Sequence, residues 1–137
     1  MAAVVAGCSP GANETALPEA AGADTATLTY TERNGLVLYS RYCVYCHGEK
    51  GDGEGMNAVN LDPKPRNFQD VQYMQTRTDQ MLQAVIQRGG PAHNFSVLMP
   101  AWGLTLKERE VQYLVRYIRT FSRDESEFET TATVLKE

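Results

Sequence analysis

The sequence predicts a small all-α domain, and three observations lead to this prediction. Three segments carry apolar residues at helical spacing, at residues 35–43, 79–88 and 106–121. The long segment between the first two is rich in glycine and proline and lacks the alternation of a β-strand. The chain of 137 residues has the length of one domain.

The first helix is predicted over residues 35–43, "GLVLYSRYC", where Leu36, Tyr39 and Cys43 recur on one face. Asn34 is its candidate N-cap because its side chain can accept a hydrogen bond from the first turn. This helix leads directly into the segment "CVYCH".

The second helix is predicted over residues 79–88, capped by Thr78 and ended by Gly89 and Gly90. Its apolar stripe consists of Met81, Leu82, Val85 and Ile86.

The third helix is predicted over residues 106–121. Thr105 and Glu108 have the T-x-x-E spacing of a capping box. The apolar face comprises Val111, Leu114, Val115, Ile118 and Phe121, and Tyr113 and Tyr117 broaden it.

Both ends of the chain differ in composition from the middle. Residues 1–29 carry a formal charge of −3, residues 30–123 carry +3 and residues 124–137 carry −4. We therefore expect a domain at 30–123, a tether before it and an acidic, flexible tail after it. The mildly basic domain lacks the dense basic stripe of a nucleic-acid-binding protein, so we expect no nucleic-acid partner.

The N-terminal stretch "VAGC" resembles a bacterial lipobox, in which Cys8 would be the lipidated residue. Residues 1–29 would then hold a truncated export signal followed by the tether. Since no apolar run reaches 18 residues, no transmembrane helix is expected, and the membrane would be reached through acyl chains on Cys8.

The segment "YCVYCHGEKGDGEG" at residues 42–55 admits four chemistries. A zinc site needs four ligands, and too few further cysteines and histidines are present. A thiol redox pair needs a βαβ context that this chain lacks, and a disulfide would leave His47 unexplained. Covalent haem attachment uses Cys43, Cys46 and His47 together.

A haem held by His47 needs a second axial ligand or an open iron position. Met99 is the preferred candidate because Pro100 fixes the backbone beside it, and His93 is its rival. The His47 ring also needs an acceptor for Nδ1–H, and we expect a backbone carbonyl within residues 60–65.

Three stretches together make the chain resemble the class I c-type cytochromes over about residues 30–123. These are "CVYCHGEKGDGEG", "LDPKPRNF" and "LMPAWGLTLKEREVQYLVRYIRTF". The resemblance implies an all-α class I cytochrome c fold, in which the N- and C-terminal helices cross and loops wrap one covalent haem c.

The same resemblance implies roles for individual residues. Cys43 and Cys46 would form the thioether bonds, and His47 and Met99 would be the axial ligands of the iron. Gly35 would lie at the close helix crossing, near Tyr117. Trp102 would lie near the haem edge and reach a propionate, and Arg66 is a second candidate propionate partner.

These roles imply a single-electron carrier rather than an enzyme, because a haem with two protein ligands has no open position. The expected partners are redox proteins or a membrane respiratory complex in the bacterial cell envelope, on the outer face of the membrane. The protein could be an anchored carrier or a haem subunit of such a complex. The alternative is a haem enzyme, a peroxidase or reductase with an open iron position.

Overall fold

The computed structural model describes residues 27–123, and every regular element in that range is helical. No strand occurs in this part of the chain, so the all-α prediction is confirmed. The candidate lipidation site Cys8, most of the expected tether and the acidic tail at 124–137 lie outside the described residues. The elements are α1 Tyr30–Tyr42, α2 Val44–His47, η1 Ala58–Asn60, α3 Val71–Gln75, α4 Asp79–Arg88, η2 Pro91–His93, η3 Trp102–Leu104 and α5 Glu108–Thr120.

Helix α1 begins at Tyr30, so the predicted start at Gly35 and the predicted Asn34 cap are wrong. Thr29 is the N-cap and forms a capping box with Glu32. The Thr29 hydroxyl accepts from the Glu32 N–H at 3.3 Å, and the Glu32 carboxylate accepts from the Thr29 N–H at 2.8 Å. Asn34 instead lies inside the helix, where its amide donates to the Tyr30 carbonyl.

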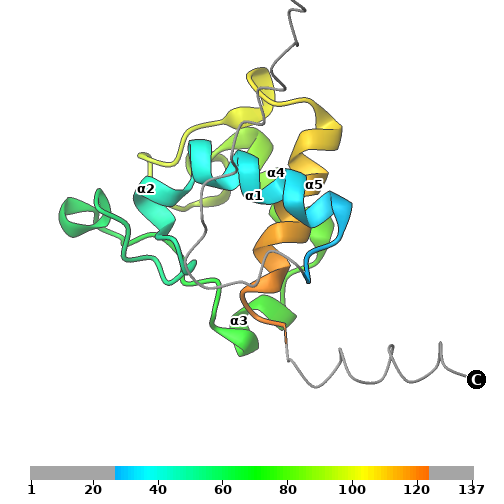
Figure 1. Cartoon of the computed structure of the whole chain (residues 1–137). Coiled ribbons are helices and arrows are strands. Elements are labelled where there is room, and N and C mark those ends of the chain that lie inside the picture. Colours follow the sequence, from blue (N-terminus) through cyan, green and yellow to red (C-terminus); the bar gives the residue numbers. More distant parts are fainter. Residues whose placement is uncertain (1–26, 124–137) are drawn as a thin grey trace, which may run out of the picture.

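Helices α1 and α5 cross, and their contact is the most extensive between any two elements of the described range (Figure 1). Gly35 lies at the crossing, as the resemblance implies. A Cβ atom on Gly35 would lie 2.6 Å from the Tyr117 Cβ and would strike the Tyr113 carbonyl, so a side chain there would force the helices apart. The buried residues of this interface are Leu36, Tyr39, Val111, Leu114, Val115, Tyr117 and Ile118.

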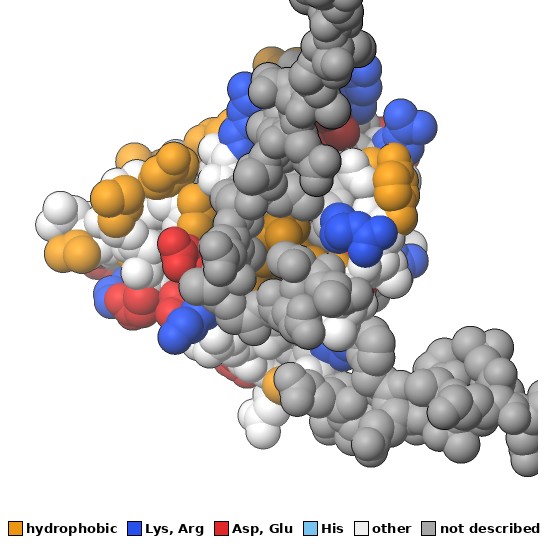
Figure 2. Space-filling view, viewed as in Figure 1, with side chains coloured by type: hydrophobic (Ala, Val, Ile, Leu, Met, Phe, Trp, Pro, Cys, Tyr) orange, Lys and Arg blue, Asp and Glu red, His pale blue; other side chains and the backbone are white. Residues whose placement is uncertain are grey.

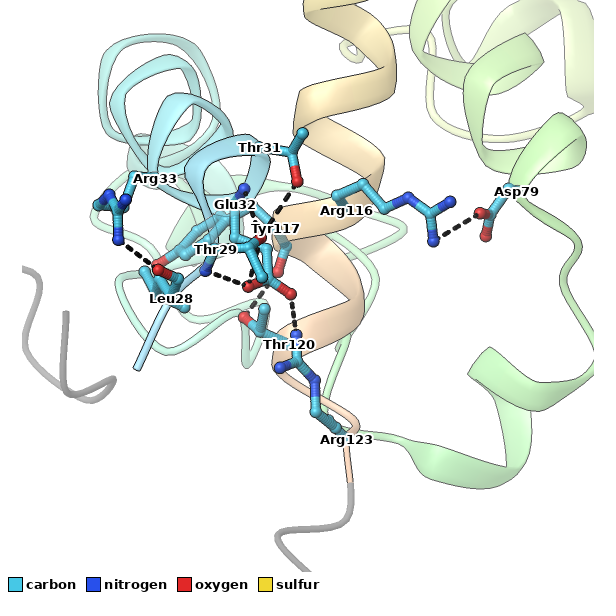
Figure 3. Close-up of polar contacts among 10 residues, drawn as sticks. All are labelled: Leu28, Thr29, Thr31, Glu32, Arg33, Asp79, Arg116, Tyr117, Thr120 and Arg123. Carbon is cyan, nitrogen blue, oxygen red and sulfur yellow. Dashed lines mark hydrogen bonds and ion pairs between the residues drawn. The ribbon is translucent and has the colours of Figure 1, made fainter. Parts of the chain in front are cut away.

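Polar contacts fasten the start of α1 to the end of α5 (Figure 3). The Arg123 guanidinium forms an ion pair with the largely buried Glu32 carboxylate. Burial by itself would raise the pKa of Glu32. Hydrogen bonds from the Thr29 backbone and hydroxyl and the charge of Arg123 outweigh burial and lower this pKa below its usual value.

Helix α4 has the bounds that the sequence predicts. The Thr78 hydroxyl caps it by accepting from the Met81 N–H at 3.2 Å, and Gly89 ends it with a φ of 78°. Arg119 of α5 donates to the Asp79 carboxylate at 2.9 Å, which fixes the first turn of α4 against α5. Figure 3 shows Arg116 reaching the same carboxylate.

Helix α5 begins at Glu108, so the predicted start at Leu106 and the predicted capping box of Thr105 and Glu108 are wrong. The N–H groups of Thr105 and Leu106 both donate to the Trp102 carbonyl, which closes η3 instead. The Lys107 N–H donates to the Glu110 carboxylate at 2.7 Å at the actual helix start.

The glycine-rich segment at residues 48–70 is tied to the helices by backbone acceptors. The Tyr39 hydroxyl of α1 donates to the Gly48 carbonyl at 2.8 Å, and the Gly53 N–H donates to the His47 carbonyl at 2.9 Å. The segment leads into α3, which the sequence did not predict and which Asp70 caps. Within residues 27–123, no helix is long and apolar enough to cross a membrane.

Candidate functional site

A cavity of about 540 Å³ lies between α2, the segment at 61–68, α4 and the loop at 93–102. Its volume is within the roughly 300–1,000 Å³ typical of cofactor and small-molecule pockets. Six residues that the sequence singled out line it: Cys43, Cys46, His47, Arg66, Met99 and Trp102. The predicted stripe of α4 lines it as well, with Met81, Leu82, Val85 and Ile86.

The short helix α2 places the two thiols and the imidazole on one wall of this cavity. Cys43 is its N-cap, and the His47 N–H donates to the Cys43 carbonyl at 2.9 Å, which closes one helical turn over the motif. Both thiols are free. The arrangement suits a planar group that two sulfurs can bond from one side.

The surroundings of Cys43 disfavour thiol redox chemistry. Burial raises the pKa of the Cys43 thiol to about 12, and the neighbouring Cys46 adds to the shift. A redox-active cysteine reacts as a thiolate and sits where its pKa is lowered. Cys43 is therefore poorly suited to act as the attacking thiolate in disulfide exchange.

His47 is held so that one ring nitrogen is available for coordination. Its ring stacks on Phe68 with centroids 4.6 Å apart, and Nδ1 lies 3.2 Å from the Arg66 carbonyl. Because a carbonyl only accepts, Nδ1 carries the proton and Nε2 carries the lone pair. Burial lowers the pKa of His47, although the Arg66 carbonyl opposes this shift, so the ring stays neutral. The acceptor predicted within residues 60–65 is therefore wrong, because it lies one residue further on, at Arg66.

Met99 lies at the end of a loop that closes on itself. The Gly90 N–H donates to the Met99 carbonyl at 3.0 Å, and the Met99 N–H donates to the Ser96 carbonyl at 3.2 Å. A Cβ atom on Gly89 would lie only 2.9 Å from the Met99 carbonyl. The thioether therefore reaches the cavity from a backbone that is fixed on both sides.

His93 also lines the cavity, so it is still an alternative to Met99 as the second ligand of the iron. Its Nε2 atom is buried and has no hydrogen-bond partner within residues 27–123.

Trp102 and Arg66 reach the cavity from different elements. Trp102, in η3, packs against Tyr42 with ring centroids 5.1 Å apart. The Arg66 guanidinium lies over the Tyr73 ring at 4.1 Å.

Arg77 is a cavity residue that sequence reasoning missed, because no motif marks it. Its guanidinium carbon lies 4.5 Å from the centroid of the Tyr73 ring, the ring that Arg66 also contacts. Its Nε atom is buried without a partner in the described range. Arg77 also lines the cavity.

The donor set fits a covalent haem better than a bare metal ion. Among the residues that the structure describes, no three His, Cys, Asp or Glu side chains gather into a group that could hold a metal. Apolar walls together with two thiols, a neutral imidazole and a thioether that all line one cavity are the features that a haem would use.

Comparison with known families gave one match. A family model described as "Cytochrome C oxidase, cbb3-type, subunit III" matches residues 31–118. The matched range contains all but the first residue of α1, the helices α2 to α4, every residue that lines the cavity and most of α5. No curated protein and no solved structure matched.

Proposed function

Because the chain belongs to the family of cbb3-type cytochrome c oxidase subunit III, we propose that it passes single electrons to a membrane respiratory oxidase. The family match covers well over half of the chain and assigns it one covalent haem c and a role in haem-based electron transfer. The haem iron supplies the one-electron chemistry when it is bound. The protein has to hold the iron, exclude other ligands and keep the surroundings of the iron fixed.

The observation that carries the proposal is that one cavity collects two thiols, an imidazole and a thioether. In this proposal, Cys43 and Cys46 form the thioether bonds to the haem. His47 would hold the iron through Nε2, and the Met99 sulfur would be its second protein ligand. The hydrogen bond from His47 to the Arg66 carbonyl supports this assignment because it orients the ring and fixes its tautomer.

Two protein ligands on the iron favour electron transfer over substrate chemistry. His47 and Met99 would together leave no position on the iron for a substrate, and both would stay in place through a one-electron change. The closed backbone around Met99 supports this, since little has to move when the charge changes. Methionine ligation also raises the reduction potential of a haem.

The proposed location is the outer face of a bacterial membrane. Acyl chains on Cys8 would anchor the protein, and residues 9–27 would act as the tether. The haem domain would begin at Leu28 and Thr29, because Leu28 is buried and Thr29 caps α1, and would extend to residue 123. A tether of that length spans at most about 70 Å when fully extended, which lets the domain move between a donor and a fixed complex. The acidic segment at 124–137 would remain a flexible tail.

Replacing Met99 with alanine tests the ligation. We expect loss of the methionine–iron charge-transfer band, new binding of carbon monoxide by the reduced protein, and a lower reduction potential. The drop should be on the order of 100 mV, since axial ligands tune haem potentials over about 0.8 V.

His93→Ala is the matched control, because His93 lines the same cavity from the same loop. It should keep the charge-transfer band and exclude carbon monoxide. The reverse pattern, with His93→Ala opening the iron and Met99→Ala leaving it closed, would reject Met99 as the ligand.

The cellular part of the proposal has its own test. Intact-mass analysis of protein from native membranes should show one haem and acyl chains on Cys8. Cross-linking in the same membranes should capture the chain with oxidase subunits. A protein without acyl chains, or one that is never captured with an oxidase, contradicts the anchor or the partner respectively.

A further inference from the structure

Two arginines share one aromatic ring on the wall of the cavity. The Arg66 and Arg77 guanidinium carbons lie 4.1 and 4.5 Å from the centroid of the Tyr73 ring, and all three residues line the cavity. Each guanidinium keeps its charge at every physiological pH. Two positive charges are therefore held close together, where they repel each other.

Neither charge is neutralised by the part of the protein that the structure describes. The ion pairs within residues 27–123 involve Lys64, Arg116, Arg119 and Arg123, and none involves Arg66 or Arg77. An anion bound by the two guanidinium groups would remove the repulsion between their charges.

The backbone of Arg77 is fixed before anything binds. Arg119 of α5 donates to the Arg77 carbonyl, and the Arg77 N–H donates to the Met74 carbonyl at 3.2 Å. Arg119 also donates to the Met74 carbonyl and to the Asp79 carboxylate, so it ties α3 and α4 together on either side of Arg77. The guanidinium therefore emerges from a rigid junction, and a ligand need not order it.

From this geometry we propose that Arg77, together with Arg66, anchors the two propionate carboxylates of the haem at the Tyr73 wall. This inference rests on the proposed haem site and adds a positioning residue to it. The propionates are the only anionic side groups of a haem, and guanidinium groups bind carboxylates in a directional, charge-assisted way. Because the vinyl groups lie on the other edge of the ring, Cys43 and Cys46 together with Arg66 and Arg77 fix how the haem is rotated in the cavity.

The charge of Arg77 should also affect the reduction potential of the haem. Oxidation of the iron adds one positive charge to the haem, and a nearby guanidinium opposes that charge. Arg77 therefore raises the reduction potential, both directly and by neutralising a propionate. Removing its charge should lower the potential even though Arg77 does not touch the iron.

The test compares Arg77→Gln, Arg77→Lys and Arg88→Gln in the mature haem protein. Arg88 is the matched control because it lies on the exposed side of α4, away from the cavity, and its replacement changes the net charge equally. We expect Arg77→Gln to lower the potential, Arg77→Lys to lower it less, and Arg88→Gln to leave it unchanged. The redox difference infrared spectrum should show a shifted propionate carboxylate band in both Arg77 variants only.

An unchanged potential and an unchanged carboxylate band in Arg77→Gln would overturn the anchor, as would an equal fall in Arg88→Gln. If Arg77→Gln does not retain haem, the carboxylate band of Arg77→Lys decides in the same way. Failure of the proposed function is seen separately, in the unsubstituted protein. That protein would then lack covalent haem or the methionine–iron band before any variant is compared.

Discussion

The crossing of α1 and α5 is filled by protein side chains, whereas the cavity leaves space for a cofactor. At the crossing, Leu36, Tyr39, Leu114 and Tyr117 are at most 1% exposed, and Gly35 lets the two backbones approach until no side chain fits between them. On the other side of the domain, α2, α4 and the loops surround about 540 Å³ of unfilled space.

Large apolar side chains are exposed on both halves, including Tyr30 and Val37 of α1, but more of them lie on the side of the cavity. Large apolar side chains are exposed on α2, in the segment that follows it and in the loop before Met99, including Tyr45, Met56, Val59, Val97 and Leu98. Figure 2 shows hydrophobic side chains gathered on the surface over that side. One half of the domain is therefore complete as a polypeptide, whereas the other half is organised around a cofactor.

Preventing haem attachment should have the largest effect. Without haem, the apolar walls of the cavity would be left in contact with water, and the burial of such surface is the main favourable term in the stability of a domain. In a protein with Cys43→Ala and Cys46→Ala, residues 48–70 and 89–101 should lose amide protection, while α1 and α5 should keep part of theirs.

Hydrogen exchange followed by mass spectrometry measures this difference directly. Equal loss of protection in α1, α5 and the cavity loops would mean that the two halves do not differ, and the comparison would be wrong. The haem-bearing protein measured in the same buffer is the control.

Gly35→Ala should give the next largest effect, because it attacks the half that is complete without haem. The added Cβ would meet the Tyr113 carbonyl and the Tyr117 Cβ, and neither can move without shifting α5. We expect a loss of about 3 kcal/mol or more in the free energy of unfolding, at the upper end of overpacking effects. The gain of about 1 kcal/mol in helix propensity would offset only part of it.

Denaturant unfolding of the haem protein measures this loss. Asn34→Ala, at the half-buried neighbouring position of α1, removes one hydrogen bond to the Tyr30 carbonyl and should cost no more than about 1 kcal/mol. A Gly35→Ala protein as stable as the Asn34→Ala protein would show that the crossing is not closely packed.

Glu32→Gln should lower the stability by about 1–3 kcal/mol near neutral pH, because it removes a largely buried charge that Thr29 and Arg123 bind. The folded protein holds the pKa of Glu32 below its ordinary value of 4.5. The stabilisation is therefore complete above about pH 4.5 and is lost as the pH falls through the lower, folded pKa.

Unfolding measured between pH 3 and pH 7 checks the sign. The difference between the original protein and Glu32→Gln should shrink as the pH falls below about 4.5. A difference that stays constant or grows in acid would show that the Glu32 carboxylate is not stabilised by its partners.

Tyr39→Phe should have the smallest effect of the four, and it tests the boundary between the halves. The Tyr39 ring belongs to the crossing, but its hydroxyl donates to the Gly48 carbonyl, directly after the proposed axial histidine. Its loss should cost about 1 kcal/mol. It should also raise hydrogen exchange in residues 48–55 more than in α5, which the same mass-spectrometric method measures. A larger change in α5 would place Tyr39 wholly in the crossing.

The features that could be predicted from the sequence are those set by residues within one helical turn of each other. Helix α4 was predicted to the residue because Thr78 caps it and Gly89 ends it, and both signals act over one helical turn. Helices α1 and α5 were predicted, but their starts were wrong. The pair Thr29 and Glu32 had the same T-x-x-E spacing as the pair Thr105 and Glu108, and only the first forms a capping box.

Some residues of the candidate site could likewise be predicted from local motifs, and others could not. The residues on the cavity wall that come from recognisable motifs, such as Cys43, His47 and Met99, could be chosen from their neighbours in the sequence. Arg77 could not, because its importance comes from Tyr73, from Arg66 and from Arg119 of α5, which the fold brings together. The acceptor for His47 was missed by one residue because backbone direction decides it, and composition carries no information about that direction.

The hydrogen bond between Gly90 and Met99 also bears on how this protein can diverge. It closes residues 90–99 into a loop whose two ends, Gly90 and Met99, are hydrogen-bonded to each other. This contact sets the position of the thioether, and residues 91–98 form the arc between the two ends. A side chain on Gly90 would strike the Ser96 carbonyl at that closure, whereas Asn94 and Val97 lie on the exposed arc. Doubling the length of a flexible arc costs only about 0.6 kcal/mol. Exposed positions of the arc such as Asn94 and Val97, which do not line the cavity, can therefore change to suit a new redox partner while the closure holds the thioether in place. At these positions, partner choice and reduction potential can evolve as separate traits.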